Sequence, residues 1–125
     1  MFGWLKKKPN GPDFSGVDSR EKAEALFQQG ILQKAYLMPL EFGGQDSPLN
    51  CVFVPQFAAQ LKAQNDTNII LPLAQDGKIK HYDAKPEYQG NSFVPIALRV
   101  TASDPGHFTY DIKIWGAALD RESPR

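Results

Sequence analysis

The sequence predicts an α+β fold: a single domain in which an antiparallel sheet of about four to five strands carries one or two helices packed on one face. Length supports this prediction, because 125 residues suffice for one domain with its own core. Patterning supports it as well, since helical spacing occurs in the first half of the chain and strand-like alternation in the second. The 42% of apolar and 22% of charged residues are typical of globular proteins.

Three segments are expected along the chain. Residues 1–16 are predicted to be a flexible N-terminal segment, residues 17–116 the α+β domain, and residues 117–125 a frayed C-terminal tail. The turn-rich sequence PNGPDFSG before the domain is typical of a linker. After Trp115 the sequence GAALDRESPR has no core pattern, which indicates fraying.

The first element expected is a helix. Asp18 and Glu21 have the spacing of an N-terminal capping pair, and Ala23 and Phe27 share one helical face. Gly30 is the expected end of this helix, because glycine adopts the left-handed conformation that closes many helices. The pattern predicts a packing helix without chemistry of its own.

The next elements are a strand at residues 32–38, a loop, a second strand at residues 51–54 and a helix at residues 56–64. The state of residues 65–76 stays open, because Pro72 can either start a turn or kink a helix.

Strands dominate the second half of the chain. The turn signal Asp76-Gly77 leads into an expected strand at residues 78–88, in which Pro86 indicates an edge strand or a strand end. Two alternating runs follow, separated by the turn-forming sequence Ser103-Asp104-Pro105-Gly106. The apolar positions of these runs are Ile96, Leu98 and Val100, then Phe108, Tyr110, Ile112 and Ile114.

Parity alone predicts the register of these two runs. Directly opposed residues of an antiparallel pair point to the same face, so even-numbered positions must oppose even-numbered ones. This places Val100 opposite Tyr110 and Leu98 opposite Ile112. The connecting loop must then hold an odd number of residues, such as residues 103–107.

Overall charge and apolar runs exclude some classes of function. Fourteen basic and fourteen acidic residues cancel, which gives no general attraction to nucleic acid. No apolar run approaches the roughly 20 residues of a membrane-spanning helix, and the N-terminus lacks the order of a secretory signal. A cytoplasmic location is therefore expected.

The N-terminal sequence MFGWLKKK allows one alternative, a weak contact with an anionic membrane surface. The residues that would make it are Phe2, Trp4, Lys6, Lys7 and Lys8.

Cys51 is the only cysteine, so the chain forms no internal disulfide. Its place in the apolar run Cys51-Val52-Phe53-Val54 predicts a small buried hydrophobe. A nucleophilic role is the alternative, although no histidine lies near it in the sequence.

Two polar groups are candidate sites. Glu41, Asp46 and Asn50 offer the carboxylate and amide oxygens that Mg²⁺ prefers, and the alternative is a solvated loop whose polar side chains cap backbone groups. His81 and Asp83 share one strand face and could act as a base and its orienting group, or form a surface pair. No cofactor is predicted.

Two aromatic residues, Tyr88 and Trp115, are either core residues or interface anchors.

A loop motif also resembles a known family. Gly43-Gly44, five further residues, Asn50 and a short apolar run ending in proline are similar to the loop and helix start of toxin-type DNA/RNA non-specific endonucleases. The segment Tyr88-Gln89-Gly90-Asn91-Ser92-Phe93-Val94-Pro95 resembles the Tyr-x-Gly-x-Ser-x-x-Pro segment of the same family. The likeness covers residues 36–101.

This resemblance implies a metal-dependent nuclease in which a histidine deprotonates water and the asparagine holds a divalent cation. The histidine lies seven positions before the glycine pair in that family, and Tyr36 stands there in this sequence. A tyrosine with a pKa near 10 is a poor base at neutral pH. The resemblance therefore implies a fold more than an activity.

The leading hypothesis is a non-catalytic cytoplasmic protein that binds another protein, for example as an accessory or immunity-type partner of a secreted toxin. The alternative is a metal-dependent phosphodiesterase that uses Glu41, Asp46 and Asn50. Membrane-surface association through residues 1–8 is the third hypothesis.

Overall fold

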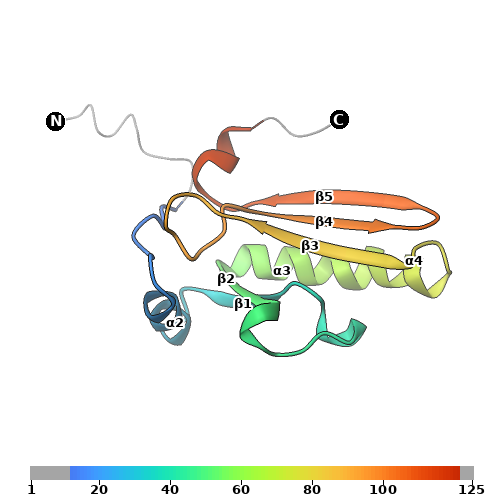
Figure 1. Ribbon diagram of the computed structural model, residues 1–125, viewed down its shortest axis with the longest axis horizontal. Helices are drawn as coiled ribbons and strands as arrows, with labels where there is room; N and C mark the ends of the chain where they lie inside the picture. Colours follow the sequence, from blue (N-terminus) through green and yellow to red (C-terminus); the bar gives the residue numbers. More distant parts are fainter. Residues whose placement is uncertain (1–11, 122–125) are drawn as a thin grey trace.

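The computed structural model describes residues 12–121 and confirms the α+β class. Its strands form two antiparallel sheets: a hairpin of β1 and β2, and a sheet with the order β3-β4-β5 (Figure 1). The bounds are β1 Gln33–Tyr36, β2 Cys51–Val54, β3 His81–Glu87, β4 Ala97–Ser103 and β5 His107–Lys113. The larger sheet thus has three strands, fewer than predicted, because helix α3, Gln56–Asn65, follows β2 directly and contacts both β1 and β5.

Helix α2, Arg20–Gln28, begins one residue later than the capping prediction implies. Ser19 is the N-cap, and its hydroxyl accepts a hydrogen bond from the backbone N–H of Lys22 at 3.1 Å. Asp18 instead binds the Lys22 ammonium at 2.7 Å. Serine fits the cap because its short side chain reaches the free N–H groups of the first turn. The helix is followed by Gly30 at φ +81°, as predicted.

The two strands of the hairpin are short. β2 has the predicted bounds, whereas β1 is shorter than the predicted strand at residues 32–38. Pairing ends at Tyr36 opposite Cys51, and beyond it the backbone of Met38 bonds to the side chain of Asn50 instead of to a strand. Cys51 is buried, as predicted.

The stretch at residues 65–76 is helical. α3 continues through a π-helical turn, Asp66–Ile70, into α4, Leu71–Gln75, and Pro72 lies in the first turn of α4. The two α-helices and the π turn therefore form one long helical segment beneath the three-stranded sheet (Figure 1).

Every fourth residue of this segment is buried, in the row Ala58, Lys62, Asp66 and Ile70. In an α-helix such a row rotates by about 40° per step, which would carry its last member away from the sheet. The wider π turn, with hydrogen bonds to the fifth residue, slows this rotation. Ile70 therefore stays buried.

The three-stranded sheet has the predicted register. Val100 pairs with Tyr110 and Leu98 with Ile112, so the apolar positions of β4 and β5 share one face. Pairing continues to Ser103 opposite His107, which leaves an odd number of loop residues, as parity requires. The sheet order places Pro86 on an edge strand, where its missing N–H is tolerated.

The core extends beyond the predicted domain limits at both ends. Phe14, expected in a flexible segment, is buried and packs edge-on against Trp115, with ring centroids 6.1 Å apart. Ala118, expected in a frayed tail, is fully buried in the turn Gly116–Asp120. The Trp115 indole is 2% exposed and donates to the Val94 carbonyl at 3.0 Å, so Trp115 is a core residue. Residues 1–11 and 122–125 lie outside the described part, and with them the predicted membrane contact.

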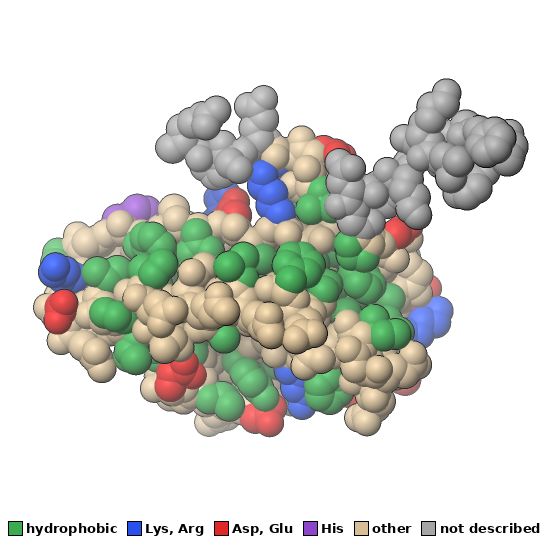
Figure 2. All heavy atoms as spheres, turned by 180° about the vertical axis from the view of Figure 1, so that it is seen from behind, with side chains coloured by type: hydrophobic (Ala, Val, Ile, Leu, Met, Phe, Trp, Pro, Cys, Tyr) green, Lys and Arg blue, Asp and Glu red, His purple; other side chains and the backbone are tan. Residues whose placement is uncertain are grey.

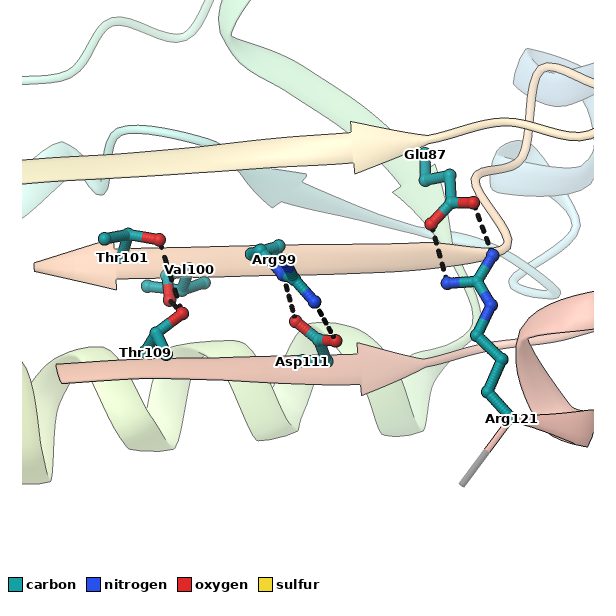
Figure 3. A network of polar contacts seen from close by, with 7 residues as sticks. All are labelled: Glu87, Arg99, Val100, Thr101, Thr109, Asp111 and Arg121. Atoms are coloured by element: carbon teal, nitrogen blue, oxygen red, sulfur yellow. Dashed lines mark hydrogen bonds and ion pairs between the residues drawn. The ribbon is translucent and has the colours of Figure 1, made fainter. Parts of the chain in front are cut away.

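The sheet turns its other face to solvent, and this sheet outer face carries paired polar groups (Figure 3). Arg99 binds Asp111 through two hydrogen bonds, at 2.7 and 2.8 Å. Thr109 donates to the Val100 carbonyl at 2.9 Å, and Glu87 pairs with Arg121 from the C-terminal turn. The charges of Arg99 and Asp111 and those of Glu87 and Arg121 are therefore paired on this face.

Within residues 12–121, none of the helices has both the length and the hydropathy of a membrane-spanning segment.

Candidate functional site

The loop between β1 and β2 is organised by Asn50. Its side-chain oxygen accepts a hydrogen bond from the Met38 backbone N–H at 2.8 Å. Its side-chain nitrogen donates to the carbonyls of Met38 and Gln45, each at 2.9 Å. The oxygen and the nitrogen of this one side-chain amide therefore both hold the loop closed by capping backbone groups.

Each of the two glycines in the loop is required by the backbone for a different reason. Gly43 has a φ of +100°, which side chains with a Cβ rarely adopt. A Cβ on Gly44 would lie 1.9 Å from the Met38 carbonyl oxygen and 2.9 Å from the Asn50 amide nitrogen. The Gly-Gly and asparagine spacing is thus explained by the closure of this loop.

The other residues predicted in this loop lie at its surface. Asp46 is exposed and forms an ion pair with Lys34 at 3.7 Å. Burial and the nearby Asp46 carboxylate raise the pKa of Tyr36, which lies at the end of β1. Glu41 is exposed in the short helical turn Leu40–Phe42 that follows β1. Among residues 12–121, no group of three His, Cys, Asp or Glu side chains is arranged to hold a metal ion.

Of the remaining predicted site residues, His81 lines a cleft together with Glu41 of this loop. His81 is exposed and lies 3.2 Å from Asp104 of the β4–β5 turn, while the exposed Asp83 lies further along β3. Tyr88 is half-exposed beside Phe93 and lines a small hollow with it, and burial raises the pKa of its phenol.

A buried polar network was not predicted from the sequence. The Lys62 ammonium, 2% exposed, binds the Asp66 carboxylate at 2.7 Å and the Tyr82 hydroxyl at 2.8 Å. The same hydroxyl donates to Asp66 at 2.8 Å, which closes a triangle between the helix and β3. Burial lowers the pKa of Lys62, although Asp66 opposes this, while burial and Asp66 raise the pKa of Tyr82.

This network lies between two clefts. The first, of about 220 Å³, is lined by Lys62 and Asp66 together with Tyr36 and Glu41. The second, of about 370 Å³, is lined by Tyr82 and again by Glu41. The Tyr110 hydroxyl is also buried and has no hydrogen-bond partner within residues 12–121; burial and Asp66 raise its pKa.

The sequence did carry one signal for the network. Lys62 and Asp66 are spaced as an i,i+4 ion pair, and they stand in the same helical row as Ala58 and Ile70. A charged pair inside an apolar row indicates burial with mutual neutralisation. The third member, Tyr82, comes from a distant strand and could not be assigned from local spacing.

A second consequence of this burial concerns the opposite side of the helix. Lys62 and Asp66 are the only charged residues between Gln56 and Gln75, and both face inward. The solvent side of the segment therefore has no charged side chain. We call it the helix outer face and define it by two exposed rows: Gln56, Gln60, Gln64 and Asn68, and beside them Phe57 and Leu61.

Figure 2 shows the molecule from the side on which this segment lies. Hydrophobic and uncharged polar side chains run across the middle of the view, and the charged side chains gather at its margins. Phe57 is 48% and Leu61 41% exposed, so two large apolar side chains meet solvent on the same row.

Searches against family models, curated proteins and solved structures find no match for this chain.

Proposed function

We propose that this chain is a non-catalytic protein-binding module and that the helix outer face is its binding surface. The observation that carries the proposal is the absence of charge from the solvent side of the helical segment Gln56–Gln75. At the chain-wide 22% of charged residues, a segment of this length would expose several charges.

Protein interfaces favour such a surface. Their central parts are depleted in charged residues, because each charge must lose its water on binding. Phe57 and Leu61 can be buried by a partner without this cost, and exposed apolar side chains grouped on one row mark contact sites. The sheet outer face differs in this respect, because its ion pairs already satisfy one another in solvent.

Cation-dependent phosphodiester cleavage has weaker support in the geometry. The side-chain oxygen and nitrogen of Asn50 are both hydrogen-bonded to the backbone of Met38 and Gln45, and Asp46 pairs with Lys34. These contacts favour a structural role for the residues that a nuclease would use to hold a cation. Protein binding is therefore the function that a specific surface of the molecule supports.

Site-specific photo-crosslinking tests the proposal. A benzophenone amino acid replaces Gln60 on the helix outer face, and a matched variant carries it at Lys85, which is exposed on the sheet outer face. We expect irradiation of cells that make these variants to yield a protein adduct from position 60 and none from position 85. Equal adducts from both positions, or none from position 60, would refute the assignment.

A further inference from the structure

The helix outer face has a property that a general binding surface does not need: it is complementary to itself. A primary amide carries two donors and an acceptor, so one glutamine can pair with another. Gln56, Gln60, Gln64 and Asn68 repeat this group at four-residue spacing along the exposed helix. A second copy of the same row can therefore offer donors and acceptors to the amides near the point of contact.

The lack of charge on the helix outer face also favours a second copy of the chain as the partner. In a two-fold contact the same patch meets itself, so any charge near the axis faces an equal charge. A surface with a net charge would repel its own copy, whereas the helix outer face has no charge to repel. The neutral face is therefore suited to a second copy of this chain.

Helix packing supplies the geometry of the contact. Rows of side chains at four-residue spacing form ridges, and such ridges of one helix fit the grooves of another. The apolar row of Phe57 and Leu61 is one ridge, and the amide row beside it is the next. An α3–α3 contact interleaves these ridges and buries the apolar side chains of both copies.

We propose that the helix outer face binds a second copy of this chain, in a weak two-fold dimer through α3. This inference rests on the binding role proposed above and names the partner. A segment roughly 30 Å long and about 10 Å wide covers less than the ~800 Å² per partner of a stable interface. The dimer is therefore reversible and depends on concentration.

A pair of charge variants tests the inference. One variant carries Gln60→Glu and Gln64→Glu, and the other carries Gln60→Lys and Gln64→Lys. In each homodimer the new charges repel across the two-fold axis, whichever of the two positions meets the other. An equimolar mixture brings opposite charges together instead. Both positions are exposed, and all four substitutions keep good helix formers, so the fold is preserved.

Sedimentation velocity gives the readout. The wild type is expected to dimerise at roughly 100 µM, each charge variant to dimerise at least about tenfold more weakly, and the mixture to regain the dimer. The control Lys85→Glu, on the sheet outer face, is expected to leave dimerisation unchanged. Circular dichroism and thermal melts are used to check that every variant is folded.

The outcomes separate this inference from the proposed function. A wild type that stays monomeric, or a dimer that the Glu and Lys variants leave intact, overturns the inference. The adduct from position 60 then decides the function: a mass other than twice the chain's mass indicates a different protein partner, and the proposed function stands without the dimer. If neither an adduct nor a dimer is observed, both the inference and the proposed function are refuted.

Discussion

Replacing Lys62 with methionine tests how the helix is held against the sheet. Methionine has a similar length and no charge, so Lys62→Met fills the space but leaves the Asp66 carboxyl almost fully buried without its cation. The lost contacts are the 2.7 Å ion pair with Asp66 and the 2.8 Å hydrogen bond with Tyr82. Asp66 keeps only the hydrogen bond from the Tyr82 hydroxyl.

The expected loss of stability is large for a domain of this size. Removing one partner of a buried ion pair costs about 3–5 kcal/mol, because an uncompensated charge stays in the interior. A single domain has a free energy of unfolding of roughly 5–15 kcal/mol, so this one change removes a substantial share. The triple variant Lys62→Met, Asp66→Leu and Tyr82→Phe is expected to be close to the wild type, since it removes all three polar groups of the network together and leaves none of them without its partner.

Urea unfolding followed by tryptophan fluorescence measures these changes, because Trp115 is 2% exposed in the folded chain. The midpoint should fall for the single variant at an unchanged denaturant slope, and recover for the triple variant. Arg99→Met, which breaks an exposed pair on the sheet outer face, is the control and should cause a much smaller loss. A single variant as stable as this control, or a triple variant no better than the single one, would refute the reasoning.

Three further predictions concern the loop and the titrating groups. Gly44→Ala should lose about 3 kcal/mol or more, because its Cβ would collide with the Met38 carbonyl, while Gly16→Ala meets nothing and should be neutral in the same urea assay. The folded protein should show less tyrosinate absorbance at pH 10.0 than the unfolded chain and should lose stability above that pH, because folding raises the pKa of all four tyrosines and the unfolded chain therefore releases protons first. Equal tyrosinate signals from the folded and unfolded chains would contradict this. The Arg99 hydrogen bonds lower the pKa of Asp111, so the stability difference between wild type and Arg99→Gln should be present at pH 7 and vanish by about pH 2, and a difference that persists in acid would count against this pair.

Sequence patterning predicted the elements whose periodicity is local. The register of β4 and β5 followed from parity, since only one parity puts Leu98 and Val100 on the same face as Tyr110 and Ile112. The start of α3 and the bounds of β2 also matched. In each case the apolar spacing reports directly on the buried face.

The differences arise where distant residues decide the structure. Phe14 lies in a turn-rich stretch, and it is buried by contacts with distant residues such as Trp115, about a hundred residues away. Ser19 is the cap instead of Asp18, and Asp18 binds the Lys22 ammonium, which capping spacing alone does not distinguish. The division into two sheets depends on where α3 packs, which spacing within the strands does not encode.

In the candidate site, too, some features follow from local sequence and others depend on distant residues. The Gly-Gly and asparagine motif was recognised, but its closure of the loop depends on the backbone of Met38 and Gln45. The helix outer face was missed, although its evidence was local: from Gln56 to Gln75 the chain has two charges, and both stand in the buried row. Scanning a helix for missing charges on its solvent side would have found it.

The central claim is the proposal that the uncharged side of the helical segment binds a second copy of this chain. The most direct measurement is a dilution series of the ¹⁵N-labelled wild type, followed amide by amide by NMR. The account predicts that shifts on dilution are confined to α3 and the adjoining π turn, and that Lys85 and Arg99 on the sheet outer face stay unchanged. Shifts centred on the sheet outer face, or none at any concentration, would contradict it.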